Sequence, residues 1–196
     1  MERSAAVSKL GHKLRQTAWR MDAHLLRPSP RVGPTGQTSD YSILVVCLGN
    51  YCRSPVAEGV LRAELSRLGL EGSVRVESAG TSTYYEGRRP HKYARREALR
   101  RGVDIGAHRA RGLNGLDLAA FDLVVTVDER TSRELSAAGA EGLVLLGSFG
   151  VGGDIADPNG CDPSVFAAAH DSIEAACHGL ARFIAGRVTA TPEVSV

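Results

Sequence analysis

From residue 41 onward, the spacing of hydrophobic positions predicts strands that alternate with helices. Short apolar runs rich in β-branched residues predict buried strands at 42–46 and 121–127. Alternating apolar and polar residues predict a strand at 74–78, and a further apolar run predicts a strand at 143–146. Apolar positions three or four residues apart predict helices at 56–68, 90–101, 129–138 and from about residue 164 onward. Such alternation is typical of an open parallel α/β sheet, whose ligands bind beyond the carboxyl ends of the strands.

The first forty residues follow a different pattern and are predicted to form an N-terminal extension, 1–40. Apolar residues recur at helical spacing between residues 7 and 25, with basic residues between them. Three prolines and two glycines between residues 27 and 38 predict a linker without regular structure. We interpret the extension as a flexible arm. A basic amphipathic helix for a membrane surface or partner, and a targeting presequence, are the alternatives.

Length and composition are those of one globular domain, predicted at 41–187 and followed by a tail at 188–196. Of the 196 residues, 43% are hydrophobic and 23% are charged, and no apolar run is long enough to span a membrane. Residues 1–40 hold seven Lys/Arg against three acids, leaving seventeen against nineteen in the remainder, a net charge of −2. The modest charge does not favour nucleic-acid binding, and the absence of a long apolar run does not favour integral membrane contact. Four cysteines are too few for a disulfide framework, which favours a cytoplasmic location.

The loop after the first predicted strand carries the candidate chemistry. Cys47 and Arg53 are separated by five residues, and Gly49 permits a tight turn just before a predicted helix. Such a turn directs successive backbone N–H groups inward as an anion-binding nest, which the helix dipole reinforces. The same features favour the thiolate of Cys47, a nucleophile directed at phosphorus. A buried structural cysteine is the alternative, but the combined features favour catalysis.

These residues resemble the phosphate-binding loop of the low-molecular-weight protein tyrosine phosphatases. The resemblance extends over most of 41–187 and includes 54–58, 77–81, 121–128 and the dipeptide Asp157-Pro158. It implies a flavodoxin-like open sheet of four parallel strands in the order 2-1-3-4, with helices on both faces. It also implies a tyrosine-phosphorylated protein substrate, no metal and no cofactor. We expect a monomer or a weak dimer.

The resemblance assigns a role to each matching residue. Cys47 would attack phosphorus and form a phosphocysteine, while Arg53 would bind the phosphoryl oxygens. Asn50 and Ser54 would brace the loop and the thiolate. Asp157 would protonate the leaving phenolate and then activate the hydrolytic water. The full phosphate-binding loop comprises Leu48, Gly49, Asn50, Tyr51, Cys52, Arg53 and Ser54.

Two other acidic residues lie near Asp157 in the sequence. Asp162 also precedes a proline, but it stands where the last helix should begin and is predicted to be an N-cap, with Pro163 as the first helical residue. Asp154 lies in the same glycine-rich loop. Asp157 is chosen because its distance from the last helix fits the family.

Aromatic residues indicate the wall of the substrate pocket. Tyr84 or Tyr85 matches the family position that contacts a phosphotyrosine ring, and Tyr84 is preferred. Tyr51 lies within the loop, where related arginine phosphatases carry a threonine, so its bulk favours phosphotyrosine over phosphoarginine. Asn159 and Gly160 stand where many members carry tyrosines, which leaves the rim of the pocket undetermined.

Cys52 is predicted to be a redox partner of Cys47, because a neighbouring thiol in the family can form a reversible disulfide with the nucleophile. Two alternative functions require a different set of residues. A thioredoxin-coupled arsenate reductase needs further cysteines downstream, and none occurs between Cys52 and Cys161. A non-catalytic phosphotyrosine-binding or redox-sensing module would be expected to lack the nucleophile or the acid.

Overall fold

The central element of the fold is a four-stranded parallel sheet in the order β4-β3-β5-β6. The computed structural model describes residues 31–32, 38–39 and 41–188. The sheet strands are β3 (Tyr41–Cys47), β4 (Val74–Gly80), β5 (Leu123–Thr126) and β6 (Leu143–Leu145). Numbered in chain order, these four strands stand 2-1-3-4, so the predicted fold class is confirmed.

Strand β3 lies between two neighbours and is buried along its whole length. Its residues alternate between the two faces of the sheet, because successive side chains of a strand point in opposite directions. Ile43 and Val45 belong to the larger hydrophobic core, whereas Leu44 and Val46 belong to the smaller core. The continuous apolar run therefore reflects burial on both faces.

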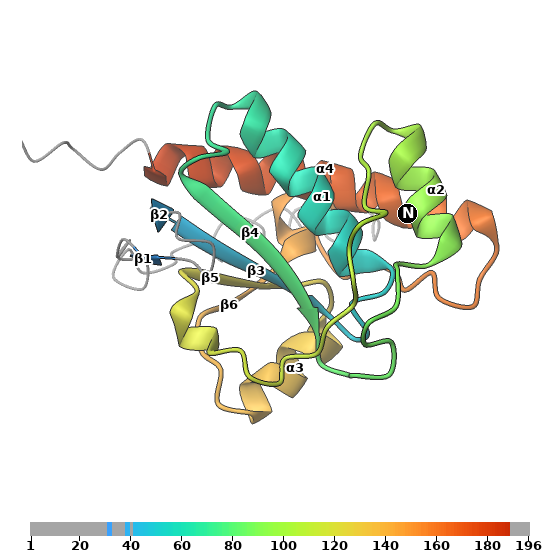
Figure 1. The fold of residues 1–196 in the computed structure, drawn as a ribbon, viewed down its shortest axis with the longest axis horizontal. Helices are drawn as coiled ribbons and strands as arrows, with labels where there is room; N and C mark the ends of the chain where they lie inside the picture. Colours follow the sequence, from blue (N-terminus) through green and yellow to red (C-terminus); the bar gives the residue numbers. More distant parts are fainter. Residues whose placement is uncertain (1–30, 33–37, 40, 189–196) are drawn as a thin grey trace, which may run out of the picture.

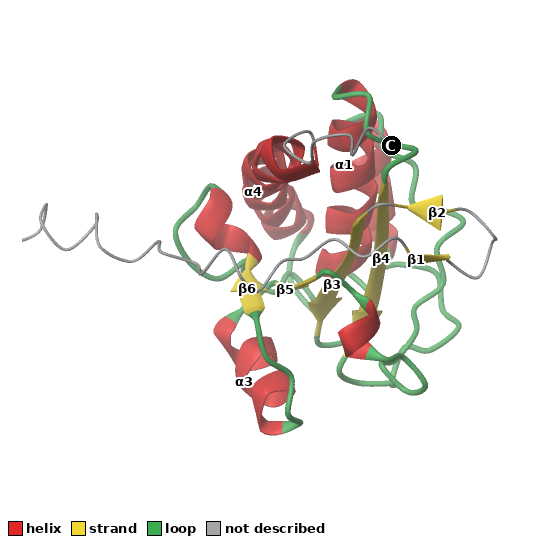
Figure 2. Cartoon of the chain, turned by 90° about the vertical axis from the view of Figure 1, so that its left-hand side faces the viewer, coloured by secondary structure: helices red, strands yellow, loops and turns green. Residues whose placement is uncertain are grey.

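Helices cover both faces (Figure 1). Helices α1 (Arg53–Arg67), α2 (Lys92–Arg100) and α4 (Pro163–Val188) lie on one side, and α3 (Glu129–Ala137) lies on the other. Figure 2 shows α1 and α4 side by side on one face of the sheet, whereas α3 lies on the opposite side. Two short 3₁₀ segments, Leu118–Ala120 and Leu146–Phe149, complete the described elements.

The predicted elements are all present, and they differ from the prediction mainly at their ends. The strand predicted at 121–127 is shorter, because the segment before it forms a 3₁₀ turn and Asp128 caps α3 directly after it. Helix α4 begins at Pro163 as predicted, and it ends one residue beyond the boundary placed at 187. Most of the N-terminal extension and the tail from residue 189 lie outside the described residues.

One expectation about the linker is wrong. Strands β1 (Arg31–Val32) and β2 (Thr38–Ser39) form a short antiparallel pair within the proline- and glycine-rich stretch. Pro34 and both glycines fall between the paired residues or directly beside them, so the breakers do not interrupt the pairing itself. None of the described helices is long and apolar enough to cross a membrane.

Candidate active site

Cys47 lies at the carboxyl end of β3, where the topology places ligand-binding loops. The thiol is buried, and its Sγ accepts two hydrogen bonds. One comes from the backbone N–H of Asn50 at 3.2 Å, and the other comes from the hydroxyl of Ser54 at 3.1 Å. The two donors therefore fix the position of Sγ within the loop.

Asn50 holds the loop in its turn. Its φ of 48° lies in the left-handed region, which asparagine tolerates better than most residues. Its side-chain amide donates to the hydroxyls of Ser54 and Ser78, each at 2.9 Å, and its Oδ1 accepts from the backbone N–H of Arg111 at 2.9 Å. The buried side chain is thus fully engaged, and the strained conformation is fixed from three directions.

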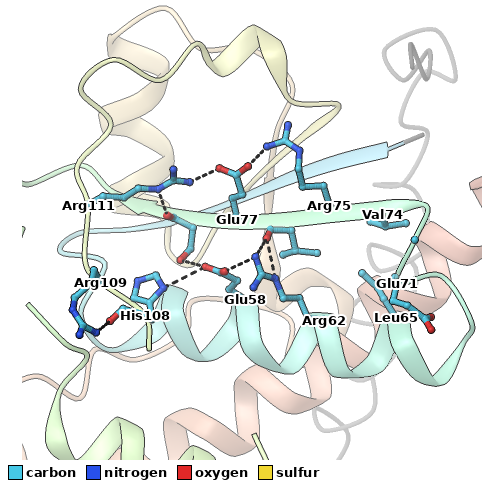
Figure 3. Close-up of a pocket in the computed structure, with 13 residues that line it drawn as sticks. Glu58, Arg62, Leu65, Glu71, Val74, Arg75, Glu77, His108, Arg109 and Arg111 are labelled. Carbon is cyan, nitrogen blue, oxygen red and sulfur yellow. Dashed lines mark hydrogen bonds and ion pairs between the residues drawn. The ribbon is translucent and has the colours of Figure 1, made fainter. Parts of the chain in front are cut away.

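A second group of residues supports Asn50 from behind. His108 Nε2 lies 3.0 Å from Asn50 Oδ1, and Ser78 donates to Glu58 at 2.6 Å. Figure 3 shows His108 and Glu58 facing each other in a groove between α1 and β4. Burial lowers the pKa of His108 to about 4, and the charge of Arg111 acts in the same direction. The imidazole is therefore neutral at pH 7, and its Nε2–H donates to the Asn50 carbonyl oxygen.

Strand β4 fits closely against the loop because it ends in glycine. A Cβ on Gly80 would lie 2.8 Å from the backbone nitrogen of Asn50 and 2.9 Å from the carbonyl oxygen of Leu48, which is too close for any side chain. The next residue, Thr81, donates its N–H to the carbonyl of Cys47 at 3.0 Å. The end of β4 thereby fixes the backbone on one side of the nucleophile.

Arg53 is buried and held by three acceptors. Its Nη1 donates to Asp128 at 2.5 Å and to the carbonyl of Ile155 at 3.1 Å, and its Nη2 donates to Asp157 at 2.9 Å. Asp128 also caps α3 by accepting the N–H of Thr131 at 2.7 Å. Burial would raise the pKa of Asp128, but the hydrogen bonds from Thr131 and the Arg53 charge outweigh it and lower the pKa. Asp128 is therefore a fixed anion behind the guanidinium.

The amino end of α1 is open to an anion. The helix begins at Arg53, its N-cap Cys52 makes no side-chain capping bond, and its first turn contains no acidic residue. The first N–H groups of a helix lack intrahelical partners and carry partial positive charge. Together with Arg53, they provide the donors that a phosphoryl group requires.

Of the three candidate acids, only Asp157 contacts the loop. Its Oδ2 binds Arg53, its Oδ1 accepts the N–H of Asn159 at 3.2 Å, and its side chain is 40% exposed. Asp154 instead accepts the N–H of Glu129 at 3.0 Å. Asp162 directly precedes α4, where the sequence predicted a cap. Asp157, the acid preferred from the sequence, is thus the one of the three that contacts Arg53 of the loop.

The two adjacent tyrosines point in different directions. Tyr85 lies parallel to Tyr51, with ring centroids 4.0 Å apart, and it covers Gly49 so closely that a Cβ there would meet the ring at 2.8 Å. Asn159 donates to the Tyr85 hydroxyl at 3.1 Å. Tyr84 meets only the edge of Tyr85 and is 75% exposed. Tyr84 is the residue that the sequence analysis preferred for the pocket wall. In this structure it is Tyr85 that contacts both the loop, at Gly49 and Tyr51, and Asn159, which follows Asp157 by two residues.

Cys52 is buried in the larger core beside the nucleophile, and both thiols are free. Burial raises the pKa of Cys52, and the nearby Asp157 and Cys47 act in the same direction. Cys52 is therefore a neutral thiol at pH 7. Within residues 41–188, no three His, Cys, Asp or Glu side chains are arranged to hold a metal ion.

Several of these residues were not predicted from the sequence as parts of the site. Asp128 ends the stretch 121–128 that resembles the family and was given no role, although a capping aspartate at the carboxyl end of a central strand could have indicated its place. Glu58 and Ser78 lie in the stretches 54–58 and 77–81 that resemble the family, but they were given no role there. His108 and Arg111 carried no local signal, because their roles come from contacts between distant segments.

The geometry places a buried, twice hydrogen-bonded thiol in an anion-binding loop at the carboxyl end of a central strand of an α/β fold. Residues 42–190 match the model of the low molecular weight phosphotyrosine protein phosphatase family. A Drosophila melanogaster protein, low molecular weight phosphotyrosine protein phosphatase 2, is 36% identical over 124 residues, which cover 60% of this chain and 75% of the relative. The chain therefore belongs to this family and is a protein-tyrosine phosphatase, as the sequence resemblance implied.

Solved structures agree with this assignment. A protein tyrosine phosphatase from Entamoeba histolytica superposes with a TM-score of 0.71 and 26% identity, covering 76% of this chain and 99% of that one. Vibrio vulnificus Wzb, solved in complex with benzylphosphonate, has a TM-score of 0.66 and 26% identity over 73% of this chain and 98% of its own. The alternative arsenate reductase function is not favoured.

Proposed function

We propose that this chain hydrolyses phosphotyrosine in proteins through a phosphocysteine on Cys47. The observation that carries the proposal is the convergence of a twice hydrogen-bonded thiol, a buried arginine and a half-exposed carboxyl group on one loop. Benzylphosphonate, bound in the Wzb structure, is an analogue of phenyl phosphate in which a methylene group replaces the bridging oxygen. It supports an aromatic phosphomonoester as the ligand class.

In the first step, the Cys47 thiolate attacks phosphorus while the bond to the phenolic oxygen breaks. Arg53 and the N–H groups at the start of α1 bind the nonbridging oxygens, whose charge shifts as the bond breaks. Asn50 and Ser54 keep Sγ directed at the incoming phosphorus. Because Asp128 holds the other side of Arg53, the guanidinium is already oriented before substrate arrives.

Asp157 must exchange partners during this step. In the free site its carboxylate pairs with Arg53. A bound phosphoryl group would take over the Nη2 donor and leave Asp157 beside a dianion. That environment favours the protonated carboxyl, which then donates its proton to the phenolate. In the second step, the resulting carboxylate removes a proton from the water that attacks phosphocysteine, releasing phosphate and the thiolate.

The direct test is hydrolysis of para-nitrophenyl phosphate by the purified full chain, with a chelator present and with or without vanadate. Turnover that vanadate inhibits supports the proposal, because vanadate adopts the geometry of the phosphoryl transition state. A folded protein without any turnover would contradict it.

Replacing Asp157 should separate poor leaving groups from good ones. We expect Asp157→Ala to slow cleavage of phenyl phosphate by about 100-fold or more, and cleavage of para-nitrophenyl phosphate much less, because a general acid matters most for a basic leaving group. The measurement is kcat for a series of aryl phosphates of graded leaving-group pKa. Asp154→Ala is the matched control. Equal slowing across the series would exclude Asp157 as the acid.

The pocket wall is proposed to consist of Tyr51 and Tyr85, with Tyr84 as the competing candidate that the sequence preferred. Tyr85 packs on the loop and accepts a hydrogen bond from Asn159, whereas Tyr84 is exposed. We expect Tyr85→Ala to raise KM for a phosphotyrosine peptide by about tenfold, the effect of losing one aromatic contact. The comparison is with Tyr84→Ala in the same assay, and a larger effect from Tyr84 would restore the original assignment.

Cys52 is proposed as the redox partner of Cys47. Peroxide would oxidise the Cys47 thiolate to a sulfenic acid, and the Cys52 thiol would displace water from it to form a disulfide. Because burial raises the pKa of Cys52, the attack requires some opening of the loop. We expect dithiothreitol to restore most activity of peroxide-treated wild type and much less activity of Cys52→Ala. Cys161→Ser is the control, and equal recovery in Cys52→Ala would remove the role.

A cytoplasmic location is also proposed. It is supported by the free thiols of the described residues, since a catalytic thiolate needs a reducing compartment.

A further inference from the structure

Basic residues are concentrated in one segment of the chain. Residues 88–101 contain seven Lys/Arg and one acid, a net charge of +6, whereas the whole chain has 24 Lys/Arg among its 196 residues. Half of this segment is basic, against about one residue in eight overall. A general preference for arginine would spread these residues along the chain, so the concentration needs a local reason.

Part of this charge is neutralised within the fold. Arg100 and Arg101 pair with Glu97 at 2.7 and 2.8 Å, and Arg101 also pairs with Asp171 and Glu174 on α4. Five basic residues have no carboxylate partner among the described residues. We call them the basic rim: Arg88, Arg89, Lys92, Arg95 and Arg96.

The side chains of the basic rim are arranged on aromatic rings and on the backbone. The guanidinium of Arg88 lies 6.0 Å from the ring centroid of Tyr85, and Lys92 and Arg96 lie over Tyr93 at 4.8 and 5.6 Å. All of the rim is exposed except Arg95, which is half-buried. The rings of Tyr85 and Tyr93 therefore orient three of these cationic side chains, and their charged groups remain available to an external anion.

The segment that carries the basic rim is hydrogen-bonded to the catalytic loop and to Tyr85, which packs on it. The N–H of His91 donates to the carbonyl of Tyr51 at 2.9 Å, and the N–H of Arg88 donates to the carbonyl of Tyr85 at 3.0 Å. Burial raises the pKa of the Tyr51 phenol, while the charges of Arg88 and Arg95 act in the opposite direction. The rim thus lies within electrostatic reach of the residues that wall the substrate pocket.

We propose that the basic rim binds acidic residues next to the phosphotyrosine, so that the preferred substrate is a phosphotyrosine within an acidic segment. The inference rests on the function proposed above. A peptide whose phosphoryl group occupies the loop must pass the neighbouring surface, where the one acid of residues 88–101, Glu97, already pairs with Arg100 and Arg101. The five cations of the basic rim have no such partner among the described residues. Single surface ion pairs contribute little, but several that act together raise both association rate and affinity.

The test compares phosphotyrosine peptides of equal length whose flanking residues are acidic, neutral or basic. We expect wild type to show kcat/KM at least about tenfold higher for the acidic peptide than for the neutral one, and to lose this preference near 1 M salt. In the triple variant Arg89→Glu, Lys92→Glu, Arg96→Glu the ratio should fall to about one or below. The control Arg67→Glu, Arg133→Glu, Arg182→Glu changes the charge equally on other surfaces and should keep the ratio.

The dissociation constants of the same peptides for Cys47→Ser measure the contribution of the basic rim to binding, without hydrolysis. Equal constants for acidic and neutral peptides, or a preference that survives in the triple variant, would overturn the inference. If wild type hydrolyses the neutral peptide, the proposed phosphatase function stands in either case. Sedimentation with vesicles of phosphatidylcholine and phosphatidylserine tests whether the basic rim binds a membrane surface instead. Rim-dependent sedimentation with these vesicles, without a peptide preference, would assign the rim to a membrane surface and overturn the inference.

Discussion

Cys47→Ser is expected to lower kcat/KM for para-nitrophenyl phosphate by about 10⁴-fold or more, the scale of losing a catalytic nucleophile. Serine is nearly isosteric and can keep the hydrogen bonds from Asn50 and Ser54. Its hydroxyl is not ionised at neutral pH, and among the described residues the hydrogen-bond partners of Cys47 Sγ, the Asn50 N–H and the Ser54 hydroxyl, include no base that could remove its proton. The loss therefore falls on the chemical step rather than on the structure of the loop.

The measurement is single-turnover kinetics, together with vanadate binding by calorimetry. Vanadate should still bind to Cys47→Ser, because the N–H groups of the loop and Arg53 are unchanged. Cys177→Ser is the control for thiol replacement, since Cys177 is buried in α4 away from the loop. Retention of more than about one hundredth of wild-type activity in Cys47→Ser would exclude Cys47 as the nucleophile.

Arg53→Lys is expected to lower kcat by about 10³-fold or more, within the range reported for arginines that stabilise phosphoryl transfer. The guanidinium makes contacts in three directions at once, to Asp128, Ile155 and Asp157. A lysine ammonium is a single point and cannot bind two phosphoryl oxygens while it also keeps the contact with Asp128. The charge remains, but the planar geometry that orients the substrate is lost.

Stability measurements separate geometry from folding. Asp128 lies behind Arg53 and would lose part of its charge compensation in Arg53→Lys, so some loss of thermal stability is also expected. Adding Asp128→Asn should relieve that strain without restoring turnover. Arg133→Lys on the surface of α3 is the matched control. Near-normal kcat in Arg53→Lys would show that a positive charge alone is sufficient.

The sequence was informative wherever the chemistry lies in one continuous stretch. The run 42–46 is buried on both faces in β3, so its apolar composition alone identified a central strand. Cys47, Asn50, Arg53 and Ser54 lie within eight residues, and a strand before them and a helix after them leave few possible arrangements. Asp157 was assigned as the general acid by resemblance, because only the Asp-Pro dipeptide and its distance from α4 distinguish it from its acidic neighbours, and that role stays a prediction.

The tertiary structure decided everything that depends on contacts between distant segments. The anchoring of Arg53 by Asp128 spans 75 residues, and the support of Asn50 by His108 spans 58. The direction of Tyr85 is set by its packing on the loop, which periodicity does not encode. The sequence by itself determined the order of elements and the candidate reacting groups, because local pattern and loop chemistry specify them. Only the tertiary structure fixed how those groups are oriented, because hydrogen bonds and ring contacts depend on distances in space.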